Sequence, residues 1–273
     1  MHLLLALGLA AVAGLAPAVA QEKSAPPNFS PNYQVGWVGL MGTGPGFAPV
    51  PGRVPPLVSD PAHPFVPNGT TKQATYRIAD LGNPNLKPWV KEHMKKDIDE
   101  VLAGKIAFTP RSSCMPAGVP GFMAYGGPEP LYFIQTQKQV WMIYSGDQQV
   151  RRVYLDVPHS ANPKPSWYGE SVGHYEGDSL VIDTIAQDER TVVDPYRTPH
   201  SAKLHVVERW KMLDGGEAME VSFTVDDPDT FYEPWSGSRR YRRARQAYTE
   251  EACAENNQHL FEYHIPTAQQ SDF

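Results

Sequence analysis

The stretch Pro199–Trp210, PHSAKLHVVERW, concentrates side chains that can move protons. Histidine titrates near neutral pH, and a carboxylic acid can serve as the second member of an acid–base pair. Read as a strand, the stretch places Glu208 on an otherwise apolar face, while alternation sends His205 to the opposite face. His200 precedes the strand, so the direction of its side chain is not fixed by the alternation.

Glu208 has two interpretations. A carboxylate on an apolar face is costly unless it is paired, so it predicts either a structural ion pair with an arginine or a functional acid facing a cavity. In the functional interpretation His200, at the rim, is the favoured partner of Glu208. A regular strand cannot bring His205 to the same side, unless a bulge intervenes.

His159 lies in VPHSANPKPSWYG and is either a surface loop histidine or a further catalytic group. We predict His200, Glu208, His159 and His205 as the catalytic candidates, with no metal and no cofactor. A histidine-based metal site is an alternative, which requires His159, His200 and His205 to converge. The sequence contains no HExxH, P-loop or dinucleotide-binding motif.

Aromatic and arginine side chains are the predicted substrate-binding groups. The aromatic candidates are Tyr154, Trp167, Tyr168, Trp210, Tyr232 and Trp235. Arg240 and Arg242 lie on one predicted strand, where alternation separates them from Arg239, Arg243 and Arg245. These arginines either pair with acids or hold an anionic ligand.

From residue 130 onward apolar residues alternate with polar ones, which predicts strands. The predicted strands are Leu131–Gln135, Val140–Tyr144, Val150–Asp156, Ser171–Tyr175, Leu180–Thr184, Leu204–Lys211, Met219–Val225 and Arg239–Tyr248. Short turns between them favour an antiparallel meander, and closure into a barrel removes exposed edges. We therefore predict a mainly β fold, an antiparallel eight-stranded barrel able to hold one small ligand, with a two-sheet sandwich as the alternative.

Two longer connections, Val157–Glu170 and Ala186–Ala202, are expected at one rim of this barrel, where they place His159 and His200. Ahead of the strands, Pro88–Gly104 predicts one helix, because apolar residues recur with helical spacing. Proline suits its first turn and glycine its C-terminal cap. We expect this helix to pack against the sheet.

The N-terminal part has a different composition. Residues 1–20 resemble a signal peptide, with an apolar core followed by Ala18-Val19-Ala20, and a membrane anchor is the alternative. Residues 21–80 are rich in proline and glycine and predict an arm or linker, partly docked on a barrel domain over 81–273. A net charge of −6 gives no sign of a nucleic-acid partner, and no later stretch predicts stable membrane insertion.

The two cysteines, Cys114 and Cys253, predict one disulfide in an exported chain. Two free thiols or a metal pair are the alternatives. The predicted location is therefore periplasmic or secreted.

Several blocks resemble a set of secreted bacterial proteins of uncharacterised function. They are RVYLD with Pro158-His159, SVGHYEGDSLVIDT over 171–184, PHSAKLHVVERW, and CAENN over 253–257. The family pattern usually has Arg and Trp where this chain has His174 and Tyr175, which disfavours His174 as a site residue. The glycine–aromatic hairpin is also similar to strand pairs of lipocalin and related calycin barrels, a likeness at the level of fold.

Together these features predict an exported barrel that binds a small apolar or aromatic molecule. The favoured function is acid–base catalysis of the lyase, isomerase or hydratase type by Glu208 with His200 or His205. A carrier without catalysis is the alternative.

Overall fold

The computed structural model describes residues 25–32, 34–40, 46–65, 77–105, 109–110, 114–124, 130–145, 149–245 and Cys253. The predicted signal peptide, residues 1–20, lies outside the described residues. No helix within the described ranges is both long and apolar enough to cross a membrane.

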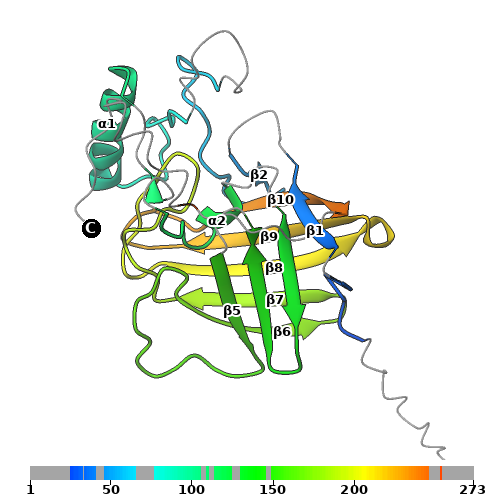
Figure 1. Cartoon of the computed structure of the whole chain (residues 1–273). Coiled ribbons are helices and arrows are strands. Elements are labelled where there is room, and N and C mark those ends of the chain that lie inside the picture. The colour runs from blue at the N-terminus through cyan, green and yellow to red at the C-terminus, as the bar shows by residue number, and fades with distance from the viewer. Residues whose placement is uncertain are drawn as a thin grey trace, which may run out of the picture.

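Nine strands form a closed barrel (Figure 1). In the order of their hydrogen-bonded neighbours they are β1 (Val35–Gly39), β3 (Leu131–Gln135), β4 (Gln139–Tyr144), β5 (Gln149–Leu155), β6 (Glu170–Glu176), β7 (Ser179–Ile185), β8 (His205–Leu213), β9 (Ala218–Asp226) and β10 (Trp235–Arg245). Pairing of β1 with β10 closes the ring. A tenth strand, β2 (Ala48–Pro49), pairs with β10 outside it, and a short 3₁₀ helix, η3 (Asp214–Gly216), joins β8 to β9.

The prediction of a β-barrel is confirmed, but the number of strands was wrong, as was the direction of one neighbouring pair. All eight predicted strands are present, and β1 is the additional one. A closed ring in which every neighbouring pair is antiparallel needs an even number of strands, so a ring of nine must contain a parallel pair. That pair is β5–β6, whereas the other pairs of the ring are antiparallel. The long connection after β5 allows the chain to return and run parallel to it.

The additional strand comes from the segment predicted as an arm, so the barrel is not confined to residues 81–273. The β1 sequence, VGWVG, contains no proline and can therefore pair on both edges, with β10 and with β3. Trp37 fills the interior, and its indole N–H donates to the carbonyl oxygen of Phe29 at 2.7 Å. The prolines around β1 limit its length but do not exclude a short central strand.

The centre of the barrel is a packed core. Phe133 from β3 and Trp210 from β8 lie on opposite walls, with their ring centroids 5.6 Å apart. Trp210 also contacts Tyr241 of β10 at 5.8 Å between centroids. Because side chains from facing walls touch, the middle of the barrel is filled by protein atoms.

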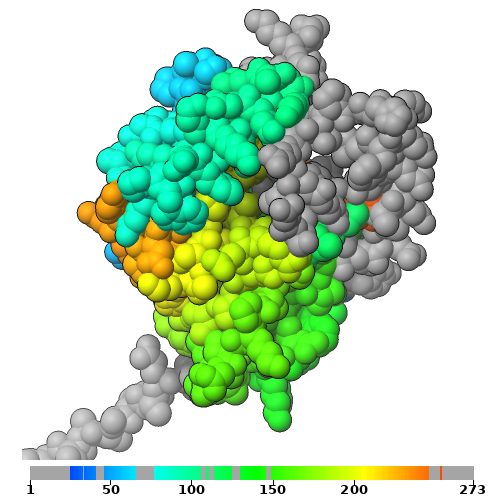
Figure 2. Space-filling view, turned by 90° about the vertical axis from the view of Figure 1, so that its left-hand side faces the viewer, coloured from blue at the N-terminus to red at the C-terminus, as the bar shows by residue number. Residues whose placement is uncertain are grey.

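The predicted helix is confirmed as α1 (Pro88–Leu102), with proline in its first turn. Gly104 follows the helix with a positive φ of 87°, a conformation that favours glycine. Its buried face carries Val90, Met94 and Ile98. The helix was expected to pack against the sheet. It lies beyond one end of the barrel (Figure 1), where the indole N–H of Trp89 donates to the carbonyl of Asp229 in the β9–β10 loop. In the space-filling view the segment around α1, in cyan and teal, contacts the yellow and orange parts of the chain (Figure 2).

A second, short helix, α2 (Gly121–Ala124), is buried along its whole length. Its Phe122 ring lies against the guanidinium of Arg151 in the barrel, 5.5 Å from ring centroid to Cζ.

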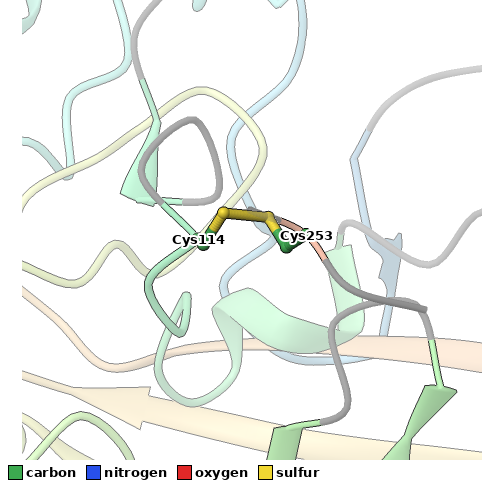
Figure 3. Close-up of a disulfide and its surroundings, with 2 residues drawn as sticks. All are labelled: Cys114 and Cys253. Carbon is green, nitrogen blue, oxygen red and sulfur yellow. A yellow bond between two sulfur atoms is a disulfide. The ribbon is translucent and has the colours of Figure 1, made fainter. Parts of the chain in front are cut away.

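The predicted disulfide is present: Cys114, just ahead of α2, is bonded to Cys253 near the C-terminus (Figure 3). The bond ties the segment around α2 to a residue 139 positions later in the chain.

Candidate functional site

Two of the predicted histidines meet on the outer face of the barrel, at the carboxylate of Asp183 in β7. The Nε2 atoms of His159 and of His205 each lie 2.9 Å from the same oxygen, Asp183 Oδ1. His205 begins β8, and alternation directs its side chain outward. His159 reaches the same point from the β5–β6 connection. The side chains of Asp183 and His205 are each 40% exposed, so the pair is accessible to solvent.

The cluster continues on β6 with Glu170. Its Oε1 lies 3.0 Å from His159 Nδ1 and accepts a hydrogen bond from the backbone N–H of Ser160 at 2.7 Å. The Ser160 hydroxyl donates to Oε2 at 2.6 Å. The order of contacts is therefore Glu170, His159, Asp183, His205. His159, at 22% exposed, is the more enclosed of the two imidazoles.

The contacts shift the pKa of three members of this cluster. The pKa of His205 is raised, chiefly by the hydrogen bond to Asp183. Burial alone would raise the pKa of Asp183, but the bonds from His205 and His159 together lower it. The bond from Ser160 is the main cause of the lowered pKa of Glu170. The two carboxylates are thus ionised at neutral pH, and His205 is a stronger base than an isolated histidine.

The His205–Asp183 pair has the arrangement of an oriented acid–base group. An ionised carboxylate only accepts hydrogen bonds, so Nε2 of His205 must carry the hydrogen. In the neutral ring Nδ1 then has a free lone pair, and within the described residues Nδ1 makes no hydrogen bond. Such a nitrogen can take a proton from a bound molecule and return it, while the carboxylate holds the ring and stabilises its charged form.

Glu208 lies on the inner face of β8 and is fully buried. It forms a two-pronged ion pair with Arg151 of β5, with N–O distances of 3.0 and 2.5 Å. Arg151 also donates to the hydroxyls of Ser171 and Thr184, and the indole N–H of Trp210 donates to Glu208. Of the two interpretations of Glu208, the structure therefore shows the structural ion pair with an arginine. The pair links β5 to β8 inside the barrel.

His200 and Glu208 do not meet, because each has its partners elsewhere. His200 is buried in the β7–β8 connection, with Nδ1 2.9 Å from the carbonyl oxygen of Ser201 and Nε2 2.7 Å from the hydroxyl of Thr191. A carbonyl can only accept, so in the neutral ring Nδ1 carries the hydrogen and Nε2 has the lone pair, beside a Thr191 hydroxyl that also lies 2.9 Å from the carbonyl oxygen of Asp188. Burial lowers the pKa of His200, which keeps this ring neutral.

We predict that His200 makes the protein less stable as the pH falls below about 6.5. The pKa of this histidine is lower in the folded than in the unfolded chain, so acid protonates the unfolded chain first. The stability difference between the wild type and a His200→Gln variant should therefore shrink on acidification. Urea unfolding of both proteins at about pH 7.5 and about pH 5 measures this. A constant difference would contradict a buried neutral ring.

The predicted substrate-binding residues are spread over the molecule. Trp210 and Trp235 are buried in the core, and Tyr232 is exposed on the β9–β10 loop. Trp167 stacks with Arg190, and Tyr168 lies against Phe122 and donates to Gln149. Arg240 pairs with Glu220, and Arg242 is exposed. Tyr154, on β5, is exposed on the outer face of the barrel that also carries Asp183.

Asp183 and Glu170 were missed from the sequence. The signal for Asp183 was a single carboxylate in the apolar strand LVIDTI. Alternation along the strand directs its side chain to the face opposite to that of Leu180 and Ile182. Its relation to His205 depends on the register, in which Asp183 lies opposite Val207. No group of three or more His, Cys, Asp or Glu side chains in the described part of the chain is arranged to hold a metal ion.

Comparison with known proteins gives no relative from which an identity follows. The chain matches no protein-family model, no curated protein and no solved structure.

Proposed function

We propose that this protein is an exported acid–base enzyme of the lyase or isomerase type. His205 is the proton carrier in this proposal, and Asp183 is the carboxylate that orients it. The observation that carries the proposal is the geometry of His205, with Nε2 bonded to an ionised carboxylate and, among the described residues, no hydrogen bond to Nδ1, on an accessible face. A general base needs this combination of fixed orientation, raised basicity and reach to a substrate.

The proposed chemistry lies on the outer face of the barrel and not in its interior. Glu208 is engaged by Arg151 and Trp210, and contacts between facing walls fill the centre. His205 and His159 remain as candidates, now joined by Asp183, whereas His200 is buried beside Thr191.

A binding surface for a small planar molecule lies on the same face. The guanidinium of Arg152 lies 4.5 Å from the ring centroid of Trp141 and donates to the hydroxyl of Tyr154. Tyr154 is opposite Val172, and Val172 is opposite Asp183. Two strand spacings therefore separate Tyr154 from Asp183, or roughly 10 Å. An aromatic substrate stacked near Tyr154 is our candidate for the molecule that reaches His205.

Export is supported by the disulfide between Cys114 and Cys253, since disulfides persist in oxidising compartments such as the periplasm. The signal-like composition of residues 1–20 agrees with this location.

We expect a His205→Gln substitution to lower the rate of proton transfer about 100-fold or more, because general acid–base catalysis contributes about 10²–10⁴-fold. The probe is a panel of aromatic ketones and hydroxy acids in D₂O, with deuterium incorporation and product formation followed by proton NMR. His174→Gln is the matched control. His174 also pairs with a carboxylate on the outer face, but with Glu176 instead of Asp183.

Equal rates in the wild type and the His205→Gln variant would overturn the role of His205. Binding of panel compounds without any exchange or conversion would instead favour the carrier.

A further inference from the structure

The β5–β6 connection is fastened to the barrel near its start by a set of side chains that we call the clasp: His159, Ser160, Glu170 and Asp183. His159 bridges two strands, with one ring nitrogen at Glu170 of β6 and the other at Asp183 of β7. Ser160 adds two hydrogen bonds to Glu170. The far end of the connection is held separately, by backbone bonds of Ser166 with Ala186 and Asp188. The segment between the two fastenings is therefore residues 161–165.

The number of hydrogens available to the clasp depends on the charge of His159. Ionised carboxylates only accept hydrogen bonds, and His159 has a carboxylate oxygen within 3.0 Å at each ring nitrogen. A neutral imidazole carries one N–H and can satisfy only one of these contacts. At the other nitrogen its lone pair would face an oxygen lone pair. Both bonds exist together only when the ring carries two hydrogens.

From this geometry we propose that the clasp is a pH-dependent latch on the β5–β6 connection. It is closed when His159 carries two ring protons, and it loosens when the ring loses one. The connection is then held at its start by Ser160 and by one ring contact in place of two, and it opens more often between there and Ser166.

The ionisable groups around the clasp are carboxylates and one further imidazole. Glu170 on β6 and Asp183 on β7 contact the ring directly. His205 on β8 shares Asp183 Oδ1, and Asp226, its partner in register on β9, adds a further negative charge beside it. Three carboxylates thus face two imidazoles, and the pKa of His205 is raised, chiefly by its hydrogen bond with Asp183.

Opening of the latch alters the neighbouring Asp183–His205 pair. When His159 leaves, Asp183 Oδ1 loses one of the two hydrogen bonds it accepts from imidazoles. Acidity outside the cell would in this way keep the connection seated beside the proposed catalytic pair.

Amide hydrogen exchange tests the latch without any substrate, so a negative result here leaves the enzyme proposal standing. The reporter is the backbone N–H of Ser160, which is bonded to Glu170 in the closed state. Between about pH 5 and about pH 9, after correction for intrinsic exchange, we expect its protection to fall about fivefold or more, the effect of losing a partly exposed charge-assisted bond. NMR of the histidine rings should show two hydrogens on His159 where protection is high and one where it is low.

His159→Gln should abolish this pH dependence, since an amide cannot switch between one and two donors. His174→Gln, which alters a histidine–carboxylate pair lying wholly within β6, should leave it unchanged. Protection that is independent of pH in the wild type would overturn the proposal, as would unchanged pH dependence in His159→Gln. A His159 ring with a single hydrogen while Ser160 is fully protected would overturn it too.

Discussion

Replacing Glu208 with alanine is expected to lower the free energy of unfolding by about 3–5 kcal/mol, because it leaves the buried guanidinium of Arg151 without its counter-charge. Arg151 is 2% exposed, and its other hydrogen-bond partners in the described part of the chain are the neutral hydroxyls of Ser171 and Thr184 and the sulfur of Met142. Small domains have unfolding free energies of about 5–15 kcal/mol, so this loss is a large fraction of the total. Urea denaturation followed by tryptophan fluorescence measures it.

A double variant, Arg151→Met with Glu208→Leu, separates the ion pair from the volume that it fills. Removing both charges together should recover most of the stability lost in Glu208→Ala, since a buried pair replaced by apolar groups of similar size is often neutral. Glu220→Ala is the surface control. It breaks the pair with Arg240, whose side chain is 63% exposed, and we expect a change below about 1 kcal/mol. A small effect of Glu208→Ala would show that Arg151 finds water or another partner.

Removing the disulfide by a Cys114→Ser and Cys253→Ser double substitution is the other large prediction. The bond closes a loop of 139 residues, for which the chain-entropy model gives a stabilisation of about 5 kcal/mol. The effect arises in the unfolded state, because the crosslink restricts the conformations of the unfolded chain. We expect the urea midpoint of the serine variant to fall accordingly. The oxidised wild type should remain folded at intermediate urea concentrations where the variant has unfolded.

Reduction of the wild type provides the control for this experiment. Reduced wild type and the serine variant should unfold at the same midpoint, since both lack the crosslink and differ only in a sulfur or oxygen atom at each site. Identical urea midpoints of oxidised and reduced wild type would contradict the prediction. They would show that the disulfide adds nothing to the stability of the barrel.

The candidate site was only partly predictable from the sequence. His205 and His159 were identified as groups able to transfer protons, and alternation correctly separated the directions of His205 and Glu208. The sequence did not connect His205 to Asp183, which lies 22 residues away on the neighbouring strand. That contact depends on the register of β7 with β8, and a shift of one residue would direct Asp183 into the core.

Residue types and their alternation determined the eight strands from Leu131 onward, the helix at Pro88 and the pairing of Cys114 with Cys253, because these follow from local periodicity or from a count of two. Tertiary structure alone decided that VGWVG joins the barrel as a ninth strand and that β5 and β6 run parallel. It also decided the partners of two acids. Glu208 is a structural group because Arg151 enters the interior from β5, whereas Asp183 is the candidate functional group because two histidines reach it on the open face. A sequence specifies which face a strand residue takes, but only the packed chain determines which charge lies opposite.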